Sequence, residues 1–273
     1  MVDSINTNTA AIAARNALAK NNKELAKQQQ NLATGSLISD PSNLPGPAGV
    51  AFALSADIKT TQAAAKNIVQ GEAFVQTGAG ALASLQEMFE QMSSLAATAN
   101  NDMTLDATAK TYLDAEYQAL KTQVGNVIAD TNFNGVKFFD GSAGTLDMQV
   151  GTAATEIITY DGGTALAPTA TGDISDATNA ATEVAALKAD RATVSAKIAE
   201  MGALKSRMGF ISNNVGTTIQ NLSGAKAAFA DTDIPAALER SQTLGALVDV
   251  AGAMMNKSLE KAGKLSELVK SAR

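Results

Sequence analysis

Apolar residues recur at every seventh position over a long stretch in the second half of the chain. One residue per heptad, the row consists of Leu187, Val194, Met201, Met208, Val215, Leu222 and Phe229. A second row falls three or four residues further on and consists of Ile198, Leu204, Ile211, Ile219 and Ala225. This spacing predicts a long helix with the a/d seam of a coiled coil. At about 1.5 Å per residue the helix measures roughly 65 Å, so other helices must cover its seam.

Two upstream segments carry matching rows. The first extends from residue 48 or 50 to residue 100 and repeats Ile68, Val75, Leu82 and Phe89. The second, from Thr104 to Ala129, repeats Leu113, Leu120 and Val127. Both are predicted to be helices that share a core with the first seam. Three glycines interrupt the earlier segment, either as close packing points or as tolerated glycines: Gly71, Gly78 and Gly80.

Turn signals separate these helices from the long one. Asn134-Gly135 and Asp140-Gly141 favour tight turns. Apolar alternation follows at Leu146, Met148 and Val150 and again at Ile157, Ile158 and Tyr160, which predicts a small β-hairpin. Residues 161–178 are rich in Gly, Thr, Ala and Asp and predict an exposed loop at the far end of the bundle. Hairpin and loop together occupy about residues 136–178.

The N-terminal region predicts a helix from Asn8 to Ala33 with one narrow apolar stripe. The stripe consists of Ile5, Ile12, Leu18, Leu25 and Leu32. Such a helix is marginal alone, so we expect it to become ordered on assembly; a solvated amphipathic tail is the alternative. Gly35 ends the helix, and a linker over residues 34–47 follows. Its prolines, Pro41, Pro45 and Pro47, argue against regular helix there.

A C-terminal helix is predicted from Pro235 onward, with Asp233 as its N-cap. One apolar row consists of Leu244, Leu247, Ala251, Met254, Ser258, Lys261, Leu265 and Leu268. A neighbouring row consists of Leu238, Val248, Met255, Leu259, Ala262 and Val269. Two rows indicate more than one packing partner. We expect one to take the N-terminal helix and the other to take another molecule.

The predicted fold class is therefore mainly α: a long antiparallel helical rod, resembling a coiled-coil bundle, with a small β-hairpin at the tip. Residues 1–33 and 231–273 form paired terminal helices, and residues 48–230 form the helical rod domain.

Composition removes most enzyme chemistry. The chain has 273 residues, of which 45% are hydrophobic and 4% aromatic, and it contains neither Cys nor His. Disulfides, thiol nucleophiles, Ser-His-Asp triads and His-ligated metals are excluded, and the acids that could act in pairs are scattered. No phosphate-binding or dinucleotide-binding motif occurs. We therefore expect no catalytic residues, no metal and no cofactor.

Charge and hydropathy limit the partners. Met1 to Lys20 lacks a basic region followed by an apolar one, and no apolar run reaches 18 residues, so neither a signal peptide nor a membrane span is expected. The net charge is −6 with a pI of about 4.8, which argues against nucleic acid. Residues 1–33 carry four basic and two acidic groups and residues 231–273 six of each, which leaves −8 for the middle. Nearly neutral ends are expected if they are buried by association.

Several short motifs, taken in order, resemble those of bacterial flagellin. In the first half they are Ser4-Ile5-Asn6-Thr7-Asn8, Asn31-Leu32-Ala33-Thr34-Gly35, and Thr131-Asn132-Phe133-Asn134-Gly135 with Asp140-Gly141. In the second half they are Met201-Gly202-Ala203, Asn221-Leu222-Ser223 and Asp231-Thr232-Asp233. The resemblance covers about residues 1–150 and 185–250.

The resemblance implies a structural subunit of the flagellar filament. Residues 1–33 and 231–273 would form the inner core, and residues 40–230 the surrounding layer. The partners would be further copies in a helical homo-oligomer, other flagellins, flagellar cap and junction proteins, and an export chaperone. The chain would be exported unfolded by the flagellar type III apparatus to the extracellular flagellum. There is no room for large outer domains between Gly141 and Asn179, so this resembles a minimal form.

In many flagellins, the stretch aligned with residues 85–91 is recognised by an innate immune receptor through an Arg and a Leu. Those positions are Glu87 and Gln91 in this chain. The resemblance therefore implies weak or no receptor activation.

Two alternatives to a filament subunit remain open at this point. A hook–filament junction protein shares the terminal pattern, and a soluble coiled-coil adaptor could use the same seams for partner helices. Four hydroxyl residues in the expected loop could carry O-linked sugars, although a solvated loop is the simpler interpretation: Thr164, Thr169, Thr171 and Ser175.

Overall fold

The structure is a computed structural model that describes residues 8–271, without the side chains of residues 265, 266, 268 and 269. The chain divides into two compact units. One is formed by residues 57–221, and the other by the two ends of the chain, up to residue 56 and from residue 222 onward. Helices α2 (Pro45–Ala99) and α4 (Ala177–Ala230) each continue from one unit into the other.

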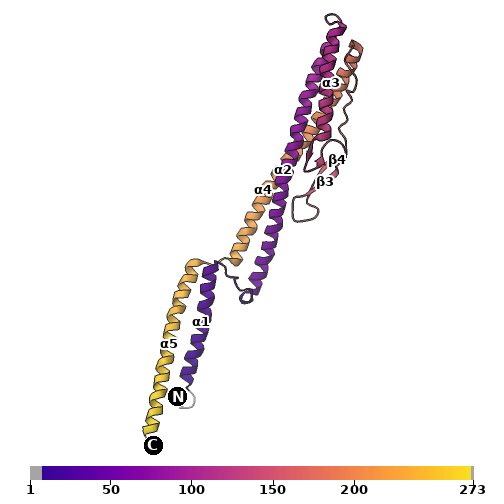
Figure 1. The fold of residues 1–273 in the computed structure, drawn as a ribbon. Coiled ribbons are helices and arrows are strands. Elements are labelled where there is room, and N and C mark those ends of the chain that lie inside the picture. The colour runs from indigo at the N-terminus through magenta and orange to yellow at the C-terminus, as the bar shows by residue number, and fades with distance from the viewer. Residues whose placement is uncertain (1–7, 272–273) are drawn as a thin grey trace. The chain divides into compact units, whose positions relative to one another are not determined.

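In the 57–221 unit, α3 (Ala107–Asp130) lies along α2 and α4 (Figure 1). The predicted seam is confirmed here, because its residues on α4 are at most 8% exposed: Leu187, Val194, Met201, Met208 and Val215. Their counterparts on α2 are at most 1% exposed: Ile68, Val75, Leu82 and Phe89. Aliphatic side chains at heptad spacing thus supply most of this core. Phe229, the last residue of the predicted seam, is 42% exposed.

Helix α3 begins three residues later than predicted. The Asp106 side chain accepts a hydrogen bond from Ala109 N at 2.7 Å, so Asp106 is the N-cap. Lys110 is buried and pairs with Asp102 in the preceding turn. The predicted row of Leu113, Leu120 and Val127 is only half-buried, and the most deeply buried residues of the same face are Tyr117 and Val124.

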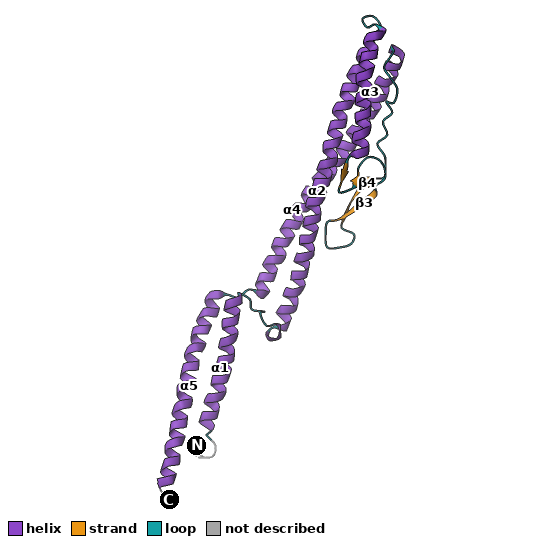
Figure 2. Ribbon diagram, in the orientation of Figure 1, coloured by secondary structure: helices purple, strands orange, loops and turns teal. Residues whose placement is uncertain are grey.

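Two antiparallel strand pairs follow α3 (Figure 2). The predicted hairpin is confirmed and consists of β3 (Gly144–Gln149) and β4 (Ile157–Gly162), with Met148 opposite Ile158. A shorter pair, β1 (Asn132–Phe133) and β2 (Val136–Lys137), surrounds the Asn134-Gly135 turn. Both turn residues have positive φ, 51° and 83°, which explains the Asn-Gly pair.

The β3–β4 hairpin lies against α2 and α4 part-way along both helices, not at the tip where the sequence suggested it. Asn67 Nδ2 donates to Gln149 O at 3.1 Å, and an Arg207 guanidinium nitrogen donates to Ile157 O at 3.3 Å. The end of this unit instead carries the α2–α3 turn (Figure 1). Gly71 makes room for the hairpin, since a Cβ there would overlap Met148, and Gly78 makes room for Phe138, which directly follows β2. They are therefore close packing points.

The prediction of an exposed loop over residues 161–178 is wrong for its central part. Leu166, Ala170 and Ile174 are buried, at 8%, 2% and 0% exposure. Backbone N–H groups between them donate to carboxylates of the helices, so the segment is fixed although it has no regular structure. We call residues 166–174 the strap. Its three apolar residues, spaced by four, are easily overlooked among Gly, Thr and Pro.

In the terminal unit, α1 (Thr9–Thr34) packs along α5 (Ile234–Ser271). Gly35 ends α1 in the left-handed conformation with φ 67°, which confirms the predicted stop. Asp233 caps α5 by accepting from Ala236 N at 3.1 Å, also as predicted.

The linker is more regular than its prolines suggested. Residues Pro41–Asn43 form a 3₁₀ turn, η1, and α2 begins at Pro45, before the predicted start at residue 48 or 50. Pro45 and Pro47 are compatible with this because N–H groups in the first helical turn have no intrahelical acceptor. The expectation that three prolines exclude helix therefore fails at residues 45–47.

Candidate functional site

The candidate site is the α1–α5 pair, the part of the chain that the sequence predicts to drive assembly. On α1, Leu18, Leu25 and Leu32 are half-buried in the pair, whereas Ile12 is 47% exposed. Ile5 lies outside the described residues. The narrow stripe of α1 is thus only partly covered within one chain.

Helix α5 buries only part of its apolar surface against α1. Ala237 and Ala251 are buried, and Leu244 and Met255 are half-buried. Leu247 and Met254, also predicted as assembly residues, are 46% and 62% exposed. The side chains of Leu265 and Leu268 lie outside the described part of the structure. The strip that meets α1 therefore combines residues from both predicted rows, because Leu244 and Met255 come from different rows.

Large apolar side chains remain exposed on both sides of that strip. We call them the α5 outer face: Ile234, Leu238, Leu247, Val250, Met254 and Leu259. Leu247, Val250 and Met254 follow the i, i+3, i+7 spacing and share one flank, while Ile234 and Leu238 lie on the other. Contiguous exposed apolar patches are typical of interaction surfaces.

Polar contacts fix the two ends of the pair. At one end, Asn8 Nδ2 donates to Ser258 O and the Ser258 hydroxyl donates to Asn8 Oδ1, both at 3.0 Å. At the other end, Asn31 is 3% exposed, and its carbonyl accepts from the Thr232 hydroxyl at 3.4 Å. Sequence reasoning gave neither Asn31 nor Thr232 a role. The available signal was that both residues lie in the short sequence motifs Asn31–Gly35 and Asp231–Asp233.

At the same end, two backbone hydrogen bonds join the segment after α1 to the segment between α4 and α5. Leu37 N donates to Ala230 O at 2.7 Å, and Thr232 N donates to Gly35 O at 2.9 Å. Next to it, the N–H and hydroxyl of Ser42 donate to Asp40 and lower the pKa of that carboxyl. Hydrogen bonds thus help to hold the segment between α1 and α2.

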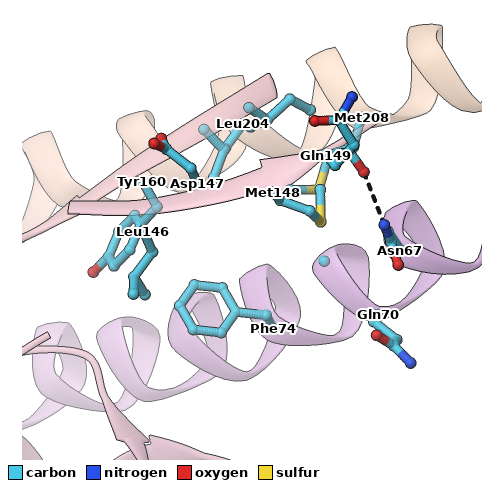
Figure 3. Close-up of a pocket in the computed structure, with 12 residues that line it drawn as sticks. Asn67, Gln70, Phe74, Leu146, Asp147, Met148, Gln149, Tyr160, Leu204 and Met208 are labelled. Carbon is cyan, nitrogen blue, oxygen red and sulfur yellow. Dashed lines mark hydrogen bonds between the residues drawn. The ribbon is translucent and has the colours of Figure 1, made fainter. Parts of the chain in front are cut away.

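A cavity of about 340 Å³ lies between the β3–β4 hairpin and helices α2 and α4 (Figure 3). Phe74, Leu146, Met148 and Met208 make its lining largely apolar. Burial raises the pKa of Tyr160 at its edge to about 12, with smaller contributions from nearby carboxylates. This residue set offers packing surface and no paired acid and base.

The two positions assigned to receptor recognition lie on α2. Glu87 is exposed, and Gln91 Nε2 donates to Glu116 Oε1 of α3 at 3.3 Å. Nearby, Arg191 of α4 pairs with Glu90 at 3.3 Å. The surface around the two positions is therefore acidic on α2, with its basic partner on α4.

Two kinds of site are absent from the described residues. Between residues 8 and 271, no cluster of three or more acidic side chains is placed to hold a metal ion. No helix in that range combines the length and apolarity needed to cross a membrane.

Comparisons with known proteins agree with one another. The family model of the bacterial flagellin N-terminal helical region matches residues 5–144, 140 of the 273 residues. The chain is 25% identical to the flagellin of Listeria monocytogenes over 98% of this chain and 99% of the other. It is 26% identical to that of Bacillus subtilis over 97% and 99%. The Bacillus cereus flagellin crystal structure matches 59% of this chain and 94% of its own, with 27% identity and a TM-score of 0.52.

None of these similarities favours a hook–filament junction protein or a cytosolic adaptor. The fold and the sequence similarity agree on one assignment. The chain belongs to the bacterial flagellin family and is a structural protein of the self-assembling, extracellular flagellar filament, not an enzyme.

Proposed function

We propose that this flagellin assembles through its α1–α5 pair, with the α5 outer face and Ile12 packing against the same elements of neighbouring subunits. The observation that carries the proposal is the exposure of Leu247, Val250 and Met254, at 46–62%, on a helix whose other side already packs on α1. Burying apolar area contributes roughly 25 cal/mol per Å², so each such side chain favours association. Ordering two marginal helices offsets part of that gain.

The proposal is tested by a double substitution, Leu247→Lys with Met254→Lys. Gln242→Lys with Asn256→Lys, at two exposed polar positions of α5, is the matched control because it adds the same charge. Slow reconcentration of heat-depolymerised protein, followed by negative-stain microscopy, should give filaments from wild type and control only. A truncation lacking residues 234–273 should also fail. Normal filaments from the Leu247/Met254 variant contradict the proposed surface.

Export and partners form a second part of the proposal. We infer that the chain leaves the cell through the flagellar type III apparatus, as the family resemblance implies, with the information in its N-terminal segment. The absence of cysteine supports this, because an unfolded chain in a narrow channel must not be crosslinked. The cap and junction proteins, co-assembled flagellins and an export chaperone are the proposed partners. Secretion that persists in cells without the apparatus contradicts this route.

Receptor recognition is the third part. We propose that the purified monomer activates the innate receptor weakly, because Glu87 and Gln91 replace the Arg and Leu of the family pattern. In a reporter-cell assay, Glu87→Arg with Gln91→Leu should increase activation over wild type. Potent activation by the wild-type monomer contradicts the proposal.

A further inference from the structure

The methionines of this chain differ widely in exposure. Met103 and Met254 are 95% and 62% exposed, whereas Met201 and Met208 are at most 2% exposed. Met148 of β3 lies between these extremes, because it is half-buried and lines the cavity between the hairpin and helices α2 and α4. Its thioether is therefore both part of a packed contact and next to an open space.

The Met148 side chain reaches from the hairpin towards α2 (Figure 3). Its Sδ and Cε, together with the Cε of Met208, fill the space that a Cβ at Gly71 would occupy. Beside this contact, Asn67 Nδ2 donates to Gln149 O at 3.1 Å. One thioether and one neighbouring hydrogen bond thus hold the end of β3 against α2.

A small oxidant can reach this sulfur without unfolding of the chain. The cavity of about 340 Å³ is partly open to solvent and is much larger than hydrogen peroxide, a molecule of about the size of two waters. In the reaction, a lone pair of Sδ attacks one peroxide oxygen, the O–O bond breaks and an S–O bond forms. The hydroxide that leaves takes the proton from the new S–OH group and becomes water. The sulfur loses two electrons, the peroxide gains them, and the product is methionine sulfoxide.

The sulfoxide would not be satisfied where the thioether lies. Because Sδ lies against Gly71, the new oxygen can only point into the largely apolar cavity. Three of the four side-chain donors that line the cavity already donate elsewhere: Asn67, Gln149 and Tyr160. The fourth, Gln70, is exposed and has no hydrogen-bond partner among the described residues. An acceptor without a donor is unfavourable in apolar surroundings, so the oxidised side chain should turn outwards to Gln70 and solvent.

We propose that Met148 is a site of reversible oxidation by hydrogen peroxide, and that its sulfoxide releases the β3–β4 hairpin from α2. Oxidation turns a flexible apolar side chain into a polar one, and methionine sulfoxide reductases reverse the change. Met208 lines the same cavity but is 2% exposed, so it stays reduced while the fold is intact. The inference goes beyond assembly, because it concerns the 57–221 unit of a single chain.

Peptide mass spectrometry tests the site on the dilute full-length chain, treated with graded concentrations of hydrogen peroxide. Met103 and Met254 should be oxidised first, because they are the most exposed, and Met148 should follow well before Met208. In denaturant, where no cavity remains, Met148 and Met208 should react at the same rate. Oxidation of Met148 that is no faster than that of Met208 in the folded chain overturns the proposal.

Amide exchange measures the consequence for the hairpin. In the natural chain, oxidation of Met148 should speed exchange of the β3 and β4 amides about tenfold or more, and methionine sulfoxide reductase should restore slow exchange. This comparison needs no substitution, so it does not depend on how a variant folds. Unchanged exchange with Met148 fully oxidised, or fast exchange that the reductase does not reverse, overturns the inference.

Substitution shows which methionine is responsible. Met148→Leu nearly conserves the volume of the side chain and removes the sulfur, so the hairpin amides should no longer respond to peroxide. Met103→Leu, at the 95% exposed methionine, is the matched control and should respond as the natural chain does. Equal responses in the two variants overturn the inference. Because all measurements use the unassembled chain, a failure of the proposed assembly surface would leave their outcome unchanged.

Discussion

At the scale of single residues, Gly78 and Gly80 of α2 differ in what surrounds them. A Cβ at Gly78 would lie 2.9 Å from two ring carbons of Phe138, which is fully buried, whereas Gly80 has open space. Gly78→Ala should therefore lower the free energy of unfolding by about 1–3 kcal/mol through overpacking. Gly80→Ala, the control, should raise it by up to about 1 kcal/mol through helix propensity. Denaturant unfolding of both variants measures the difference, and equal effects would refute the packing role of Gly78.

Tyr160 is 5% exposed and donates its hydroxyl hydrogen to Phe138 O at 3.1 Å. Burial raises its pKa from 10.0 to about 12. Below pH 10 the folded and the unfolded chain both keep the Tyr160 proton, so the stability that the buried neutral phenol contributes is fully present. Between pH 10 and 12 the unfolded state ionises first, so the free energy of unfolding falls, by about 2 kcal/mol at most.

Tyr160→Phe removes this titration. The variant should be less stable than wild type at neutral pH by about 1 kcal/mol, the usual value of one hydrogen bond. The deficit should shrink as the pH rises above 10. Unfolding measured at a series of pH values checks this, and a deficit that stays constant to pH 11 and beyond would contradict it.

At the scale of elements, the strap depends on carboxylates of α4. Asp190 is 5% exposed and accepts from Thr169 N and the Thr169 hydroxyl, both at 2.8 Å, and from Ala170 N at 2.9 Å. Glu183 accepts from Gly172 N at 2.9 Å and from the Tyr117 hydroxyl at 2.5 Å. Charge-assisted bonds of this kind replace the regular ladder that the strap lacks.

Asp190→Ala should detach the strap locally. We expect faster amide exchange at residues 169–174 and a loss of about 2–3 kcal/mol in unfolding free energy, because several buried donors lose their acceptor. Asp161→Ala is the matched control, since Asp161 is exposed and accepts only from Gly163 N, two residues away. If exchange at the strap is equal in both variants, the strap is held by Leu166 and Ile174 alone.

The strap could not be predicted from the sequence, whereas the helices could. Heptad rows identified α2, α3 and α4 and the pairing of α2 with α4, because helix cores repeat with a fixed period. The same reasoning missed the strap, since its three buried residues belong to no period and its backbone is satisfied by distant carboxylates. It also placed the hairpin at the tip, because the room for Met148 of the hairpin comes from Gly71, whose packing role no sequence spacing reveals.

For the proposed assembly site, the sequence predicted the apolar rows but not which of their residues would pack on α1. Leu244 and Met255 belong to different predicted rows yet are both half-buried in the α1–α5 pair, while Leu247 and Met254 remain exposed. Which side chain meets α1 depends on helix rotation, and that is set by small residues such as Ala237 and Ala251 that carry little hydrophobic signal.

At the scale of the whole molecule, the two units should differ in stability before assembly. The 57–221 unit buries large side chains, including Phe89, Tyr117 and Leu187, whereas the α1–α5 pair fully buries only small or polar ones among its described residues, such as Ala251 and Asn31. Two helices with so little buried area are marginal in water.

In the free monomer, amides of α1 and α5 should therefore exchange rapidly while the α2 and α4 amides of the 57–221 unit are protected. In filaments, α1 and α5 should gain protection as neighbours cover Leu247, Val250 and Met254. Exchange mass spectrometry at low and high protein concentration compares the states, with the Leu247→Lys/Met254→Lys variant as a control that stays monomeric. Strong protection of α1 and α5 in dilute monomer would mean that the pair is complete within one chain, and the force for assembly would then have to come from the 57–221 unit.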